Sequence, residues 1–167
     1  MKTKENNFAF IDSQNLYRGI ERLGWKLDFK KFRIYLKDKY SVNIAYVFIG
    51  YTIDNQDLYA SLQKAGYILI FKPTLPNEDG DLKGNVDADL VLQAMLDYKN
   101  YDGAVIVSSD GDFYSLVKYL YKNKKLKKVL SPYTKTCSSL LKKEAKERIV
   151  YMDNLKKKLS YKKKNTA

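Results

Sequence analysis

Short apolar runs alternate with segments of helical apolar spacing along most of this chain. A continuous apolar stretch of about four to eight residues between turn formers is typical of a strand buried on both faces. Such runs predict strands at residues 8–11, 42–51, 67–71, 104–107 and 127–130, with a further short edge strand at 148–152. Apolar residues at helical spacing predict helices at 16–23, 28–36, 54–65, 86–98 and 113–121, and another that begins at Ser138 or Ser139.

This alternation predicts a three-layer α/β/α fold, in which helices cover both faces of a mainly parallel sheet. With strands numbered along the chain, we expect the order 3-2-1-4-5, so that the winding reverses between the first and fourth strands. The length of 167 residues suits one domain, predicted at 1–155, followed by a frayed, lysine-rich tail at 156–167. Residues 72–85 hold two prolines, two glycines and three acids, and predict a mobile surface loop.

Three aspartates are predicted to meet at one edge of the sheet. Asp12 ends the first strand, whereas Asp110 and Asp112 follow the fourth strand on either side of a glycine. Because neighbouring parallel strands lie about 4.8 Å apart, residues at their carboxyl ends share one crevice. This crevice is where open α/β sheets bind ligands.

Asp87 is expected to add a fourth carboxylate to this crevice from a helix. At about 100° per residue, it falls in the middle of an apolar helical face. That face is formed by Val86, Leu90, Val91, Ala94, Met95 and Tyr98. An inward carboxylate needs a partner, because burying an unpaired charge is costly. The alternatives are a helix-capping or dipole role for Asp87, or an ion pair with Lys83.

The residue types narrow the chemistry of such a crevice. The chain has no histidine and one cysteine, Cys137, which excludes histidine-based catalytic pairs, histidine zinc sites and intrachain disulfides. Clustered carboxylates repel one another, so either one pKa rises or a cation binds. Oxygen ligands favour Mg²⁺ or Mn²⁺, and Asn15, one turn after Asp12, is placed to orient a water or a phosphate.

Charge is divided unevenly along the chain. Residues 1–117 carry 14 Lys and Arg against 16 Asp and Glu, a net charge of −2, whereas residues 118–167 carry 17 against 3, a net charge of +14. A basic end on an acidic body indicates a polyanionic partner and favours nucleic acid. No apolar run reaches the roughly 18 residues of a membrane helix, and residues 1–7 are polar, so we expect no membrane partner and a cytoplasmic location.

Three segments resemble the NYN domain family of PIN-like metal-dependent ribonucleases, in its LabA-like branch. They are 10–17 with Asp12 and Asn15, 83–90 with Lys83 and Asp87, and 107–113 with the Asp110-Gly-Asp112 turn. The resemblance implies a PIN-like (Rossmann-like) fold, RNA as the substrate, and metal binding by Asp12, Asp87, Asp110 and Asp112, with Asn15 as a polar residue that assists them. Beyond the resemblance, we expect the RNA to be single-stranded and Ser108 and Ser109 to bind it. Lys83 either touches a substrate phosphate, neutralises the acids without a metal, or is a solvated loop lysine.

The chain departs from that family pattern at three positions. Ser109 replaces a glycine, Asn85 is inserted before the valine of the second motif, and Gln93 stands where relatives often carry an acid. The leading hypothesis is a metal-dependent endoribonuclease, and the alternative is a non-catalytic RNA-binding module, which Gln93 favours. A phosphotransfer receiver would need an aspartate after the third strand, where the chain has Phe71-Lys72-Pro73. A homodimer through an exposed helix face is a further expectation.

Overall fold

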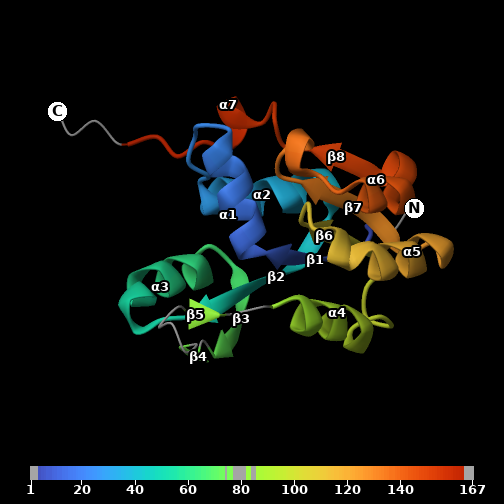
Figure 1. The fold of residues 1–167 in the computed structure, drawn as a ribbon, viewed down its shortest axis with the longest axis horizontal. Coiled ribbons are helices and arrows are strands. Elements are labelled where there is room, and N and C mark those ends of the chain that lie inside the picture. Colours follow the sequence, from blue (N-terminus) through green and yellow to red (C-terminus); the bar gives the residue numbers. More distant parts are fainter. Residues whose placement is uncertain (1–3, 74, 77–81, 84–85, 164–167) are drawn as a thin grey trace.

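A single parallel sheet of six strands forms the centre of the structure, a computed structural model that describes residues 4–73, 75–76, 82–83 and 86–163. The strand order is β3-β2-β1-β6-β7-β8 (Figure 1). The strands are β1 (Asn7–Asp12), β2 (Val42–Tyr51), β3 (Tyr67–Pro73), β6 (Gly103–Val107), β7 (Leu126–Ser131) and β8 (Ile149–Tyr151). The predicted fourth, fifth and edge strands are β6, β7 and β8. The predicted order 3-2-1-4-5 is therefore confirmed, and the short strand β8 extends the sheet beyond β7.

Helices cover both faces of the sheet and complete the three predicted layers (Figure 1). One face packs against α4 (Asp87–Leu96), α5 (Tyr114–Lys122) and α6 (Ser139–Ala145). The other face packs against α1 (Ser13–Arg22), α2 (Phe29–Tyr40), α3 (Gln56–Lys64) and α7 (Lys156–Leu159). No helix in the described ranges is long and apolar enough to cross a membrane.

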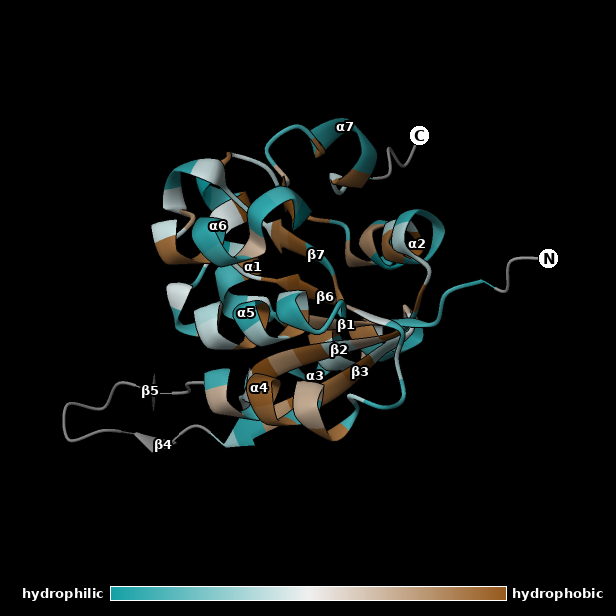
Figure 2. Cartoon of the chain, turned by 90° about the vertical axis from the view of Figure 1, so that its right-hand side faces the viewer, coloured by the Kyte–Doolittle hydropathy of each residue, from teal (hydrophilic) through white to brown (hydrophobic). Residues whose placement is uncertain are grey.

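The core consists of two apolar layers, one on each face of the sheet. In β1, Phe8 and Phe10 point into the layer under α4 and α5, whereas Ala9 and Ile11 point into the layer under α1 and α2. Both strands at the centre, β1 and β6, are buried along their whole length, and Figure 2 shows that the strands inside the helical layers are mainly hydrophobic (brown). Burying a large apolar side chain contributes about 1.5–3 kcal/mol, so this centre is a stable base for residues at its edge.

Local signals in the sequence explain where several of these helices begin or end. Asp28 caps α2 by accepting a hydrogen bond from the backbone N–H of Lys31 at 3.1 Å, and Ser138 caps α6 in the same way through Leu140 at 3.2 Å. Gly24 follows α1 with a φ of 83°, a left-handed conformation that glycine adopts without strain. Ser138 is thus the cap, and α6 begins at Ser139.

Three expectations need correction or lie outside the described residues. The third helix begins at Gln56, because residues Ile53–Asn55 form a 3-10 turn before it. The strand predicted at 67–71 continues to Pro73, and the following segment contains a short antiparallel pair, β4 (Leu75–Pro76) with β5 (Leu82–Lys83). The rest of the predicted loop, at residues 74, 77–81 and 84–85, lies outside the described part of the chain.

The tail predicted to fray is packed where the structure describes it. Residues Lys156–Leu159 form α7, and the Leu159 side chain is buried in the layer under α2. The backbone N–H of Asp28 donates to the Leu159 carbonyl at 2.8 Å, and the N–H of Tyr161 donates to the Lys26 carbonyl at 2.8 Å. The expectation of fraying overlooked Leu159, a single apolar residue in a lysine-rich stretch.

Candidate metal centre

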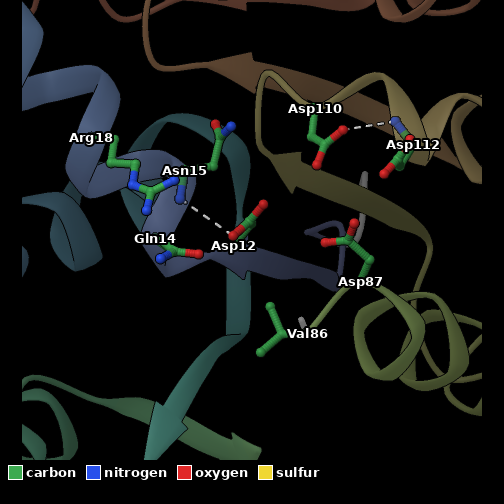
Figure 3. Close-up of a pocket in the computed structure, with 8 residues that line it drawn as sticks. All are labelled: Asp12, Gln14, Asn15, Arg18, Val86, Asp87, Asp110 and Asp112. Carbon is green, nitrogen blue, oxygen red and sulfur yellow. Dashed lines mark hydrogen bonds between the residues drawn. The ribbon is translucent and has the colours of Figure 1, made fainter. Parts of the chain in front are cut away.

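A polar pocket of about 270 Å³ opens at the carboxyl edge of the sheet, where the winding reverses between β1 and β6 (Figure 3). Parallel sheets of this type bind ligands at this point. The lining residues come from the ends of both strands and from α1, α4 and the turn before α5. They are Asp12, Gln14, Asn15, Arg18, Val86, Asp87, Asp110 and Asp112.

Asp12 forms the buried floor of this pocket. It is the last residue of β1 and the N-cap of α1, and only 5% of its surface is exposed. One carboxylate oxygen accepts a hydrogen bond from the Asn15 backbone N–H at 3.4 Å, and the other accepts from the Ser108 hydroxyl at 3.1 Å. The strand end and these two donors hold the carboxylate in a fixed position.

Asp110 and Asp87 face Asp12 from two other elements. Asp110 caps the 3-10 turn Gly111–Phe113, and its carboxylate accepts from the Asp112 backbone N–H at 2.9 Å. Asp87 begins α4, which packs against β1 and against that turn. Each of the three acids offers one carboxylate oxygen, and these three oxygens lie within 4.8 Å of one another. The predicted convergence of residues from three distant segments is therefore present.

Asp112 and Asn15 have different positions from these three acids. Asp112 lines the pocket at its exposed rim and is not part of the group within 4.8 Å. The Asn15 side-chain oxygen accepts a hydrogen bond from the Ser109 backbone N–H at 2.8 Å. Asn15 thus ties α1 to the turn after β6, and its side-chain NH₂ group is the donor left to face the pocket.

Ser108 and Ser109 lie beneath the acids and not at the surface. Both are buried, at 0% and 3% exposed. The Ser108 hydroxyl donates to Asp12 and accepts from the Asp110 backbone N–H at 3.1 Å, and the Ser109 hydroxyl is bonded to Ser131 at 2.7 Å. The Ser108 hydroxyl thus helps to position Asp12 and Asp110, and the Ser109 hydroxyl ties this turn to the end of β7.

Lys83 and Gln93 are the remaining residues singled out in the sequence. Lys83 lies in β5, and its side chain is outside the described part of the structure. The Gln93 side chain donates to Asp97 at 2.9 Å, and the same carboxylate oxygen accepts from the Tyr46 hydroxyl at 2.6 Å. Gln93 therefore belongs to a bridge between α4 and β2 and does not line the pocket.

Gln14, Arg18 and Ser131 are parts of the site that the sequence did not reveal. Gln14 and Arg18 both line the pocket from α1. Arg18 follows Asn15 by three residues, so helical spacing was an available signal for Arg18. Ser131 is the last residue of β7, and only the parallel register of β6 with β7 brings it to Ser109. Arg18 adds a positive side chain to an otherwise acidic pocket.

The electrostatics of the pocket disfavour three charged acids together. Burial raises the pKa of Asp12, and the charge of Asp110 raises it further, against the hydrogen bonds from Asn15 and Ser108. The pKa of Asp87 is raised to about 6, first by burial and then by the charges of Asp110, Asp12 and Asp112, although Lys72 lowers it. A bound cation would remove this repulsion.

The donor set fits a hard divalent cation. All three convergent donors are carboxylate oxygens, and the chain has no histidine and one cysteine, Cys137, buried outside the pocket. Oxygen donors of this kind suit Mg²⁺ and Mn²⁺, which are bound by a few carboxylates together with water and substrate oxygens. The cluster could therefore hold such an ion.

Asp87 is expected to make the metal-free protein less stable as the pH rises. The pKa of Asp87 in the fold is about 6, above the value near 3.8 expected in an unfolded chain. The folded state thus keeps this proton to higher pH, and stability is lost as the pH rises from about 4 through about 6. The free energy of unfolding, measured with denaturant in EDTA across this pH range, should fall in the wild type relative to Asp87→Asn. An equal difference with Asp89→Asn, in the same helical turn, would contradict it.

Comparison with known proteins supports the fold and identifies the family. The family model of the NYN domain matches residues 8–153. A crystal structure of a protein of unknown function from Vibrio parahaemolyticus superposes with a TM-score of 0.75 and 25% identity, over 92% of this chain and 98% of that chain. No curated protein matches the sequence. The match covers the strands, the α4 acid and the Asp110 turn alike, and the chain belongs to the NYN domain family.

Proposed function

We propose that this protein is a metal-dependent endoribonuclease of the LabA-like branch, which hydrolyses RNA phosphodiester bonds at the acid pocket. The observation that carries the proposal is the convergence of Asp12, Asp87 and Asp110 within 4.8 Å at the switch point of the sheet. NYN domains act on nucleic acids and are generally ribonuclease-like, and this acid cluster is compatible with that activity. A cytoplasmic location and a homodimer are further proposals from the sequence.

The three convergent acids would hold Mg²⁺ or Mn²⁺. When bound, such an ion neutralises charge on the phosphodiester and lowers the pKa of an attacking water. Asp112, exposed at the rim, is placed to accept a proton or to contact a water on the open side. Arg18 and the Asn15 amide are donors in the same pocket, suited to hold phosphate oxygens.

The basic end of the chain would supply long-range attraction to RNA. Residues 118–167 carry 17 Lys and Arg against 3 Asp and Glu, whereas the pocket itself is acidic. An acidic pocket alone would repel phosphate, so these cations supply the attraction to RNA, and a bound metal ion would add to it at the pocket. Affinity for RNA is therefore expected to fall steeply with salt.

A circular single-stranded RNA tests the proposal directly. The circle has no ends, so only an endonuclease can linearise it. We expect linear product with Mg²⁺ or Mn²⁺ and none in EDTA. The Asp110→Asn variant, purified in the same way, controls for contaminating nucleases. Linearisation that continues at an unchanged rate in EDTA or in this variant would refute the assignment.

A non-catalytic RNA-binding module is the second candidate. The observation that favours it is Gln93, which is bonded to Asp97 and adds no carboxylate to the pocket. Such a module would bind RNA in a salt-dependent way and would leave the circular RNA intact with every divalent metal. In that case neither the wild type nor variants of the pocket acids would cleave RNA, and these substitutions would change only metal binding.

A further inference from the structure

Three aromatic rings form a cluster at the carboxyl ends of β2 and β3. The centroid of Tyr59, on α3, lies 4.8 Å from that of Phe71, and Tyr51 lies 5.8 Å from Tyr59 and 5.5 Å from Phe71. Tyr59 is buried beneath the other two, whereas Tyr51 and Phe71 are 42% and 38% exposed. Single exposed aromatic side chains are common, but a packed pair with an aromatic base beneath it is a built surface.

Hydrogen bonds hold this aromatic cluster in place. The Tyr59 hydroxyl accepts from the Thr52 backbone N–H at 2.9 Å and donates to the Gly50 carbonyl at 3.1 Å. The Gln56 side chain donates to the Tyr51 hydroxyl at 2.9 Å. Rings fixed in this way lose little conformational freedom when a planar ligand stacks on them.

The aromatic cluster and the acid pocket share one edge of the sheet. Asp12 is paired with Phe48 in β2, and Phe71 is paired with Ile49, the next residue of β2. With strands about 4.8 Å apart and about 3.3 Å per residue, the backbone of Phe71 lies roughly 10 Å from that of Asp12. Lys72 follows Phe71 and is close enough to Asp87 for its charge to lower the pKa of that acid.

We propose that Tyr51 and Phe71 form a stacking platform for a base of single-stranded RNA whose phosphate lies at the acid pocket. The proposal rests on the proposed function, since it names the form of RNA that this pocket takes. Every base has a π-face, so stacking on tyrosine and phenylalanine tolerates any sequence. Bases in a duplex already stack on one another and cannot reach the platform. A protein partner would not need an acid pocket at the same edge of the sheet.

Binding of short RNA in EDTA separates the platform from catalysis. With a single strand of about 10 nucleotides, we expect Tyr51→Ala and Tyr51→Leu to raise Kd by about 5- to 100-fold, and Tyr51→Phe to leave it unchanged. Tyr51→Leu keeps apolar bulk over Tyr59, so its thermal unfolding controls for damage to the fold. Tyr161→Ala, at an exposed tyrosine beside Lys26 and outside the pocket, is the matched control.

A spectroscopic variant reports stacking itself. In Tyr51→Trp, single-stranded RNA is expected to quench the new indole fluorescence, whereas duplex RNA of the same length leaves it unchanged. The wild type, which has only the buried Trp25, gives the background. Equal Kd values for wild type and Tyr51→Leu, or equal quenching by duplex, would overturn the platform.

Cleavage of circular RNA in the presence of metal is measured as a separate experiment. If the protein cleaves the circle but Tyr51 variants bind RNA as the wild type does, only the proposal of a stacking platform is refuted. If binding depends on Tyr51 but the circle is not cleaved, only the proposal of a nuclease is refuted.

Discussion

Asp12→Asn is expected to raise the thermal stability of the metal-free protein and to lower metal-dependent RNA cleavage by roughly 100-fold or more. The first effect follows because the substitution removes one of three crowded negative charges, and Asp12 is the most buried of them. Asparagine is as good a helix N-cap as aspartate, so the capping bond from Asn15 is kept. Stability and activity therefore change in opposite directions.

The loss of activity in Asp12→Asn follows from metal binding. Replacing a residue that only orients a metal ligand already lowers metal affinity or activity by about 10- to 100-fold. Replacing a direct carboxylate ligand is expected to lower them at least as much. The same variant should lose the rise in melting temperature that Mg²⁺ or Mn²⁺ produces in the wild type, because an ion that binds only the folded state stabilises it. Differential scanning fluorimetry with EDTA or metal, together with circular RNA, measures both effects.

Asp28→Asn is the matched control for Asp12→Asn. Asp28 caps α2 with a bond of 3.1 Å from Lys31 and lies outside the acid pocket, so both substitutions are aspartate to asparagine at a helix N-cap. We expect Asp28→Asn to leave metal stabilisation and RNA cleavage unchanged. If Asp12→Asn kept the metal-induced rise in melting temperature, the carboxylate cluster would not be a metal site.

Gly111→Ala is expected to disable the site through sterics alone. A Cβ added at Gly111 would lie 2.3 Å from the Ser138 hydroxyl oxygen and 2.9 Å from the Ser138 Cβ. The backbone of Gly111 is not in the left-handed region, so the cost comes from this collision with the start of α6. Overpacking of this kind costs about 1–3 kcal/mol. Because Gly111 stands between Asp110 and Asp112, relief of the clash would displace these acids, and a displacement of about 1 Å can cost about 100-fold in rate.

Ser138→Gly gives a test of this steric explanation. It removes both atoms that collide, and glycine at a helix N-cap costs only a few tenths of a kcal/mol relative to serine. We therefore expect the double variant Gly111→Ala/Ser138→Gly to recover most of the stability and RNA cleavage that Gly111→Ala loses. Additive losses in the double variant, measured by denaturant unfolding and by cleavage rate, would show that Gly111 matters for another reason.

The acid pocket could be predicted from the sequence because two regular geometries determine it. The ends of adjacent parallel strands share an edge, so Asp12 and Asp110 had to be neighbours once the strand order was inferred. The helical period turned Asp87 inward from α4. Neither step needs knowledge of side-chain packing. The set of three within 4.8 Å is smaller than the predicted set of four, since Asp112 turns to the rim.

Contacts that depend on loop conformation were not accessible in the same way. Ser108 and Ser109 were expected to bind substrate, and nothing in the sequence indicated that each is buried and hydrogen-bonded to Asp12 or to Ser131. The lysine-rich tail was expected to fray, but Leu159 anchors it under α2. In these cases one side chain decides the outcome, and no periodic pattern identifies it.

By itself, the sequence determined the strand order, the helices on both faces and the meeting of Asp12, Asp87 and Asp110, because these follow from repeating backbone geometry and apolar periodicity. Only the tertiary structure decided which side chains complete the surface around them. Ser131 beneath the pocket and the Tyr51–Phe71 pair beside it come together through strand register and packing. These contacts join residues that are distant along the chain, and their energies depend on positions within a few ångströms that no local pattern specifies.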